Sequence, residues 1–191
     1  GILERDSPPS QGCAGSLILV DGMSVPVSWV VGLLMALEPT APWSNTYEKT
    51  AEAIARAAES DPLFADEEGG EARTASLLVS LAWHESRLRP DAKSKDGRFL
   101  CLYQVARSYL PEPKKALQDP ETCTRAAMRI LKRSFQTCTK RPLSERLAIY
   151  ISGYCERGHP QSRMRMRLAD KLLEEHPLPP PSREATTTRA R

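Results

Sequence analysis

Apolar residues are most concentrated in residues 75–83, where the sequence reads ASLLVSLAW. With helical spacing these side chains lie on nearly every side of one helix, and a helix that is apolar all round is normally buried in a domain core. Pro90 is expected to stop this helix soon after its apolar part. The pattern therefore predicts a buried central helix.

The rest of the chain alternates between helical spacing and cap or turn residues. One further helix is expected to be capped by Ser28 and to end at Glu38, and the next to start with a capping box of Asn45 and Glu48. A short helix is expected from about Leu102, and a longer one starts at Asp119 and Pro120 and runs to about Gln136. The last two are expected over about 143–152, ending at Gly153, and over 161–175. Strand-like alternation is rare. The expected fold class is therefore mainly α.

Composition divides the chain into three parts. Residues 1–24 mix Pro, Gly and a short apolar run and are expected to form an N-terminal arm. Residues 25–175 are expected to form the domain, with leading helices over 28–60 and a core over 71–175. Residues 176–191 are basic, rich in Pro and poor in apolar side chains, which is typical of a disordered tail.

The formal net charge of the 191-residue chain is +3. This charge is too small to indicate a nucleic-acid partner, although it is compatible with an acidic polymer. The best candidate for a membrane span, residues 25–37, is broken by Pro26 and ends at Glu38, so no transmembrane segment is expected. No signal peptide is visible, and we expect a monomer.

The five cysteines, at positions 13, 101, 123, 138 and 155, form no CxxC pair, which argues against a zinc ribbon. Their number favours two disulfides and one odd thiol in an oxidising compartment. Buried free thiols in a cytosolic protein are the alternative. Cys123 and Cys138 fall near opposite ends of one expected helix, roughly 22 Å apart, so these two should not pair.

An acid, Glu85, stands where the apolar helix is expected to end, and Ser86 follows it. The negative end of the helix dipole and an apolar surround both raise the pKa of a carboxyl group at such a position. A raised pKa is what a proton donor needs near neutral pH. The alternative is a half-exposed acid paired with Arg87 or Arg89.

A metal site is not expected at this position. His84 and Glu85 begin like the zinc-protease motif HExxH, but Leu88 occupies the position of the second His. We also expect no cofactor.

Three short motifs follow one another along the chain: Glu85-Ser86, residues 101–104 (CLYQ) and residues 148–153 (AIYISG). In this order they resemble the Glu-Ser, Gly-Leu-Met-Gln and Ala-x-Tyr-Asn-x-Gly motifs of the lytic transglycosylase (SLT-type) domain. The resemblance covers roughly residues 72–175. Two departures from the family pattern matter most: Cys101 replaces the Gly and Ile151 replaces the Asn.

The resemblance implies a lysozyme-like helical fold in which the buried central helix carries the catalytic Glu. It implies cleavage of the MurNAc-β-1,4-GlcNAc bond of bacterial peptidoglycan, with formation of 1,6-anhydro-MurNAc and with Glu85 as general acid and base. The residues expected to hold the acid or bind the glycan are Ser86, Tyr103, Gln104, Tyr150 and Ser152. The implied location is extracytoplasmic, whether periplasmic, secreted or in a phage virion.

Two alternatives remain open at this point. A goose-type lysozyme would hydrolyse the same bond and would need a second acid to activate water, for which Asp91 and Asp96 are the nearby candidates. A non-catalytic glycan-binding domain of a cell-wall or phage-tail assembly is the other alternative. It has no evident use for an uncompensated acid at position 85.

Overall fold

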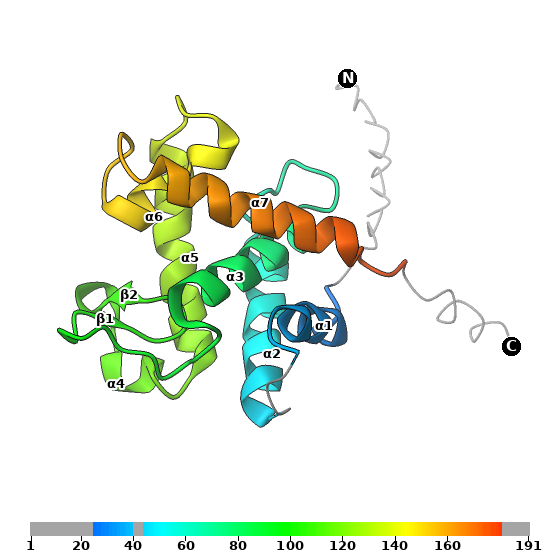
Figure 1. Cartoon of the computed structure of the whole chain (residues 1–191), viewed down its shortest axis with the longest axis horizontal. Helices are drawn as coiled ribbons and strands as arrows, with labels where there is room; N and C mark the ends of the chain where they lie inside the picture. Colours follow the sequence, from blue (N-terminus) through cyan, green and yellow to red (C-terminus); the bar gives the residue numbers. More distant parts are fainter. Residues whose placement is uncertain (1–24, 40–43, 181–191) are drawn as a thin grey trace, which may run out of the picture.

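The computed structural model describes residues 25–39 and 44–180, and it confirms the mainly helical class (Figure 1). Its α-helices are α1 (Val27–Leu37), α2 (Asn45–Ser60), α3 (Gly70–Ser86), α4 (Pro113–Ala116), α5 (Pro120–Thr137), α6 (Ala148–Ser152) and α7 (His159–Glu175). Its 3-10 helices are η1 (Arg107–Tyr109) and η2 (Leu143–Glu145). Strands β1 (Phe99–Leu100) and β2 (Val105–Ala106) form one antiparallel pair.

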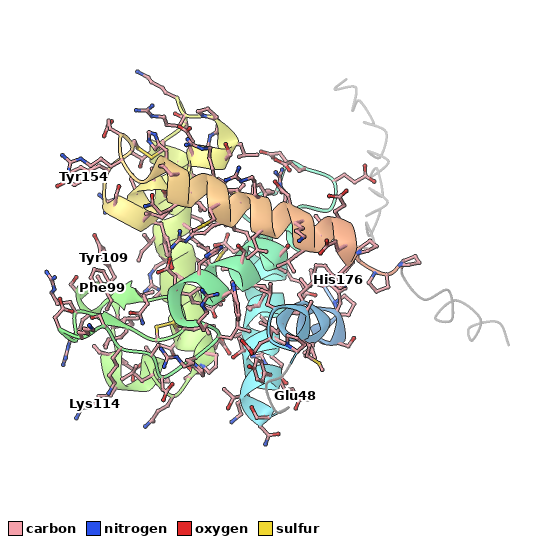
Figure 2. All side chains as sticks on the ribbon, viewed as in Figure 1. Glu48, Phe99, Tyr109, Lys114, Tyr154 and His176 are labelled. Atoms are coloured by element: carbon pink, nitrogen blue, oxygen red, sulfur yellow. A yellow bond between two sulfur atoms is a disulfide. The ribbon has the colours of Figure 1, made fainter. Side chains whose placement is uncertain are left out.

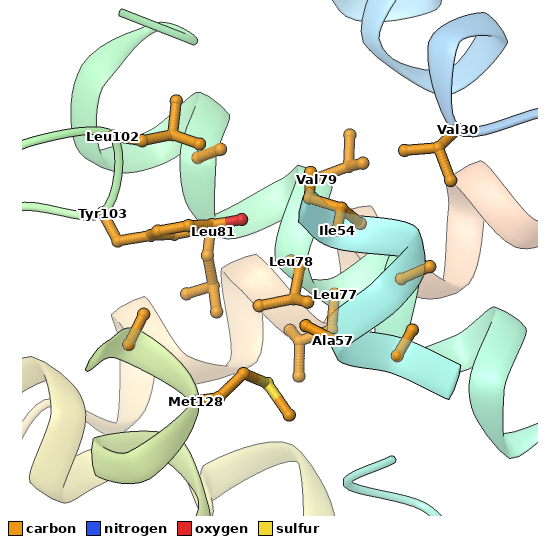
Figure 3. Close-up of a cluster of buried hydrophobic side chains, with 14 of the residues drawn as sticks. Val30, Ile54, Ala57, Leu77, Leu78, Val79, Leu81, Leu102, Tyr103 and Met128 are labelled. Atoms are coloured by element: carbon orange, nitrogen blue, oxygen red, sulfur yellow. The ribbon is translucent and has the colours of Figure 1, made fainter. Parts of the chain in front are cut away.

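Helix α3 lies at the centre of the fold, with α1, α2 and α7 packed around it (Figure 1). Its side chains Leu77, Leu78 and Leu81 have no exposed surface. Figure 3 shows Leu77 and Leu78 beside Ala57 of α2 in the core. Full burial of one such leucine side chain contributes about 1.5–3 kcal/mol to the stability of the folded state. The buried central helix predicted from the sequence is therefore confirmed.

Two buried serines on α3 fix how α7 lies along it. The Ser76 hydroxyl donates to the carbonyl oxygen of Ala169 at 2.5 Å, and the Ser80 hydroxyl donates to that of Arg165 at 2.7 Å. The two serines are four residues apart in α3, and the two acceptors are four residues apart in α7. Four residues make about one helical turn, so both bonds lie on the same face of each helix. Sliding α7 along α3 would leave buried hydroxyls without acceptors, which costs about 1–3 kcal/mol for each group.

Helix α3 ends at Ser86 because the next two residues are left-handed. Arg87 has φ 55° and Leu88 has φ 61°, and both donate their N–H groups to carbonyl oxygens of α3. The Leu88 side chain is buried, and this contact offsets part of the steric cost of the left-handed backbone. The predicted end of the helix at Glu85-Ser86 is therefore confirmed, although these left-handed residues and not Pro90 stop it.

The predicted start of α5 is confirmed. The Asp119 side chain accepts hydrogen bonds from the backbone N–H groups of Glu121 (3.3 Å) and Thr122 (3.2 Å), and Pro120 takes the first helical position. This arrangement satisfies two of the N–H groups that have no partner within the helix.

Two other predicted helix starts are wrong in detail. Ser44 is the N-cap of α2 and makes no capping bond with its side chain, so the capping box predicted from Asn45 and Glu48 does not form there. Pro26 takes the N-cap position of α1, so Ser28 lies inside the helix and does not cap it.

The short helix expected from Leu102 is also wrong, because this segment is the turn between β1 and β2. Cys101 (φ 64°) and Gln104 (φ 47°) are left-handed, which a helix does not allow. The helix expected over 143–152 is divided into η2 and α6. Its predicted end is confirmed, since Gly153 closes α6 with φ 82°.

Two disulfides join the cysteines of the described residues. Cys101 pairs with Cys123, and Cys138 pairs with Cys155, at Cα–Cα distances of 6.2 and 5.4 Å. The predicted lack of a Cys123–Cys138 bond is therefore confirmed, while Cys13 lies outside the described residues. Because Cys123 lies in α5 and Cys138 directly follows it, both disulfides tie a loop to this helix.

The folded part continues slightly beyond α7. The Trp29 indole N–H donates to the His176 carbonyl oxygen at 2.8 Å, and Leu178 packs against the core. Residues 176–178 therefore belong to the folded domain and not to the tail expected from the sequence. The predicted arm and residues 181–191 lie outside the described residues. Within the described ranges, none of the helices combines the length and apolar character that a membrane span requires.

Removing the Cys101–Cys123 bond should destabilise the protein measurably. The Cys101→Ala/Cys123→Ala protein is expected to lose about 3 kcal/mol of unfolding free energy, since the bond closes a loop of 22 residues. The Cys101→Gly/Cys123→Ala protein should lose about 1 kcal/mol less, because glycine adopts a φ of 64° without a steric penalty. Urea unfolding measures both values. Equal stability of the wild-type and Ala proteins would contradict this account, as would a Gly protein less stable than the Ala one.

Candidate active site

Glu85 lines a cavity of about 330 Å³. Helices α3 and α7 contribute Glu85 and Arg165 to its lining. The remaining lining residues come from the β1–β2 segment and from α6: Phe99, Tyr103, Gln104, Tyr150 and Ile151. Segments far apart in the sequence therefore meet around one acid.

The Glu85 carboxylate is held by Arg165 of α7. The Nη2 and Nε atoms of Arg165 lie 2.8 and 3.1 Å from the same oxygen, Oε1. The two side chains are largely buried, with 10% of Arg165 and 19% of Glu85 exposed. No partner of the other oxygen, Oε2, occurs within the described residues, so Oε2 is available to a bound molecule. The expectation that the charge of Glu85 is uncompensated is therefore wrong, because the positive charge of Arg165 compensates it.

The arginines that follow Glu85 in the chain are engaged elsewhere. The guanidinium of Arg87 stacks on the Trp83 ring at 4.3 Å. The Nε atom of Arg89 donates to the carbonyl oxygen of Ser86 at 3.1 Å. The pairing of Glu85 with one of these neighbours, which the sequence left open, is therefore wrong.

Tyr150 joins the two sides of the cavity. Its hydroxyl donates to the carbonyl oxygen of Tyr103 at 2.6 Å, which connects α6 to the β1–β2 turn. Burial, and after it the charge of Glu85, raises the pKa of the Tyr150 phenol well above its usual value. Tyr150 therefore stays neutral and acts as a hydrogen-bond donor that holds the cavity together.

Tyr103 borders the cavity, but its side chain is in the core. The residue has no exposed surface, and Figure 3 shows its ring beside Leu81 and Leu102. Burial also raises the pKa of its phenol. The hydroxyl has no hydrogen-bond partner of good geometry among the described residues; the nearby Thr124 hydroxyl donates instead to the carbonyl oxygen of Pro120. The Tyr103 side chain therefore does not present the exposed sugar-binding surface expected of it.

Ser86 is buried and does not line the cavity. Its hydroxyl donates to the Ala82 carbonyl oxygen and accepts from the Arg89 N–H, both at 3.1 Å. Ser86 therefore stabilises the end of α3, and in this way the position of Glu85, without facing a ligand.

Gln104 and Ser152, the other two predicted binding residues, occupy different places. Gln104 lines the Glu85 cavity, and its Nε2 donates to the carbonyl oxygen of Cys101 at 3.2 Å. Ser152 lines a neighbouring cavity, and its hydroxyl is bonded to Ala148 O at 2.9 Å. Gln104 and Tyr150 therefore line the cavity that contains Glu85, and Ser152 does not.

Asp91 and Asp96, the acids proposed for a hydrolase, lie outside the Glu85 cavity. Asp91 lines a separate hollow beside α2 and α5. Asp96 accepts bonds from the Ser94 hydroxyl at 2.6 Å and from Arg98 Nε at 2.5 Å. The Ser94 hydroxyl, with the Arg98 N–H groups, holds the pKa of the Asp96 carboxyl well below its usual range. Asp96 therefore stabilises its own loop.

The backbone is left-handed at four non-glycine residues of the described chain, namely Arg87, Leu88, Cys101 and Gln104. Gln104 lines the Glu85 cavity, and the other three lie within three residues of a lining residue in the sequence. Such conformations are uncommon for residues other than glycine and cluster at functional sites. Cys101, which takes the place of a Gly in the motif that the sequence resembles, has this left-handed backbone and is bonded to Cys123.

Arg165 is not among the site residues predicted from the sequence. Arg165 is only 9% exposed. Its spacing gave a usable signal, because it lies three residues after the buried Ser162 and four before the buried Ala169. A charged residue in that buried stripe requires a partner.

No group of His, Cys, Asp or Glu able to hold a metal ion occurs in the described part of the chain.

Comparison with protein families gives a match to the transglycosylase SLT domain over residues 62–159. Neither curated proteins nor solved structures gave a match to this chain. The matched range contains all three motifs noted in the sequence and covers more than half of the chain. It also agrees with the mainly helical, lysozyme-like fold and with glycan-cleaving activity on peptidoglycan at the level of the family. The chain therefore belongs to the transglycosylase SLT domain family.

Proposed function

We propose that the protein is a lytic transglycosylase that cleaves the MurNAc-β-1,4-GlcNAc bond of peptidoglycan and forms 1,6-anhydro-MurNAc. The observation that carries this proposal is that Glu85 is the only carboxylate lining its cavity within the described residues. Inverting and retaining hydrolases normally place a second carboxylate about 5–9.5 Å from the first. A reaction that uses one carboxylate twice fits this lining better.

In the proposed reaction Glu85 first acts as the acid. Its carboxyl group gives a proton to the glycosidic oxygen while the bond from that oxygen to C1 of the muramyl unit breaks. The resulting carboxylate then takes the proton from the C6 hydroxyl of the same muramyl unit, and the C6 oxygen bonds to C1. No water is consumed, and Glu85 is protonated again at the end. Proton transfer of this kind typically contributes about 10²–10⁴-fold to a rate.

Arg165 acts as the positioning residue for Glu85. Both of its nitrogen contacts are on Oε1, so Oε2 is the oxygen proposed to carry the transferred proton. When the proton leaves, the guanidinium stabilises the carboxylate that remains. The bonds from α3 to α7 hold Arg165 in register for this task.

The neighbouring cavity walls are proposed to bind the glycan. Gln104 has an amide that a sugar acetamido or hydroxyl group can meet. Tyr150 keeps the two walls together through its bond to the Tyr103 carbonyl. The two disulfides fit an extracytoplasmic location, where peptidoglycan is found.

Replacing Glu85 with Gln should keep the fold and lower the rate of cell-wall cleavage by about 10²-fold or more, because the amide cannot donate the proton. Clearing of a suspension of purified cell walls measures the rate. Glu112→Gln, which changes an exposed acid outside the cavity, is the matched control and should behave as the wild type. A Glu85→Gln protein that retains more than about a tenth of the wild-type rate would refute the assigned role.

The chemical form of the product ends distinguishes a transglycosylase from the lysozyme alternative. Mass spectra of the released fragments should show anhydro-muramyl ends, which are lighter by one water than reducing ends. Asp91→Asn and Asp96→Asn should each keep near-normal activity, because neither acid lines the Glu85 cavity. Reducing ends that appear in step with cleavage, together with a loss of about 10²-fold in either variant, would identify a hydrolase.

Substitutions of Arg165 test its positioning role. Arg165→Gln should lower kcat by about tenfold or more with a smaller change in KM, because the acid loses its orientation. Arg165→Lys should recover part of that loss, since it restores the charge without the two-nitrogen contact. Steady-state rates on soluble glycan strands, with circular dichroism to confirm folding, measure the effect. A Lys protein no better than the Gln protein would show that charge at this position is not what matters.

A further inference from the structure

A second cavity of about 350 Å³ adjoins the one that contains Glu85. Four residues line both cavities: Phe99, Gln104, Tyr150 and Ile151. The two cavities are therefore compartments of one cleft, and a substrate bound at Glu85 lies beside the second compartment.

The walls of the second compartment are largely apolar. Ile130 of α5 and Ile149 of α6 line it, together with Tyr109 and Phe99. The two aromatic residues are 53% and 41% exposed, and Figure 2 shows them on the same edge of the molecule. Such walls suit a ligand with small apolar groups as well as polar ones.

One charged side chain lines this compartment, that of Arg133 on α5. Arg133 is exposed and forms no ion pair or hydrogen bond with any residue that the structure describes. Its neighbours along the helix are engaged: Arg129 donates to the carbonyl oxygen of Tyr109, and Arg125 pairs with Glu121. Among the described residues, Arg133 is therefore the guanidinium of this compartment that is left to bind an incoming anion.

The chemistry of the glycan strand limits what that anion can be. The two alternating sugars carry uncharged acetamido and hydroxyl groups, which do not need a guanidinium. The muramyl unit also carries, on its lactyl ether, a short peptide with free carboxylates and alanine methyl groups. A guanidinium binds a carboxylate through two parallel hydrogen bonds, and apolar walls accept methyl groups.

We propose that the second compartment binds the acidic peptide of the muramyl unit through Arg133, and that the enzyme prefers peptide-bearing strands to bare glycan. This inference rests on the proposed function, because it assigns a substrate group to the same cleft. It makes Arg133 a specificity-determining residue that takes no part in the proton transfers.

The test compares soluble glycan strands that carry their peptides with the same strands after an amidase has hydrolysed the lactyl–alanine amide, which leaves each muramyl unit with only its short lactyl carboxylate. Wild-type kcat/KM should be about fivefold to tenfold higher on the peptide-bearing strands, the gain expected for one partly solvated charged hydrogen bond. Arg133→Gln should lower kcat/KM on these strands alone and bring the ratio to about 1. Arg133→Lys should keep part of the preference. Arg125→Gln, outside the cavity, should leave the ratio unchanged.

Each other outcome overturns the proposal. A wild-type ratio of about 1 would mean that the peptide is not recognised. An equal loss on both kinds of strand in Arg133→Gln would mean that the compartment binds sugar. The same comparison made by titration calorimetry with the Glu85→Gln protein gives the binding preference without cleavage. Failure of the wild type to cleave either strand would therefore refute the proposed function, while the calorimetry would still decide whether Arg133 selects the peptide.

Discussion

The register between α3 and α7 is the constraint on which the site depends. Two buried serine hydroxyls on α3 donate to carbonyl oxygens of α7, one of which belongs to Arg165 itself. These bonds place the Arg165 guanidinium against Glu85, 80 residues earlier in the chain. A shift of α7 by a single residue would separate the pair and leave a largely buried carboxylate without compensation, which is among the more costly defects in a protein interior. The close packing that completes the core thus also orients the acid.

Helix α5 has a comparable role for the cleft walls. One disulfide ties the β1–β2 turn to it, and the other ties the loop after α6 to it. The Tyr150 hydroxyl then joins these two walls directly across the cavity. Cys101 and Gln104 of the β1–β2 turn have a left-handed backbone, which costs free energy in a non-glycine residue, so covalent and hydrogen-bonded ties help to keep it. The position of Cys101 combines both features, since it is left-handed and disulfide-bonded.

The features that the sequence predicted well are those that short stretches of chain determine. The burial of α3 follows from its run of apolar residues, and the start of α5 follows from Asp119 and Pro120. The place of Glu85 at the end of α3 follows from the same local pattern. Arg165 as its partner could not be deduced in this way, because their contact depends on how two distant helices pack. The turn at Leu102 was missed for a related reason: its left-handed residues are held by tertiary ties that no local propensity encodes.

The range matched by the family ends at residue 159, where α7 begins. The piece of chain that a sequence comparison recognises is therefore smaller than the piece that folds. Met166 and Leu172 of α7, with Leu33 of α1 and Ile54 of α2, fill the core from outside that range. Excising residues 62–159 as a transferable module would expose most sides of α3 to water and would discard the counter-ion of the acid. A transferable piece that keeps both the core and the partner of the acid is therefore expected to need α1, α2 and α7 as well.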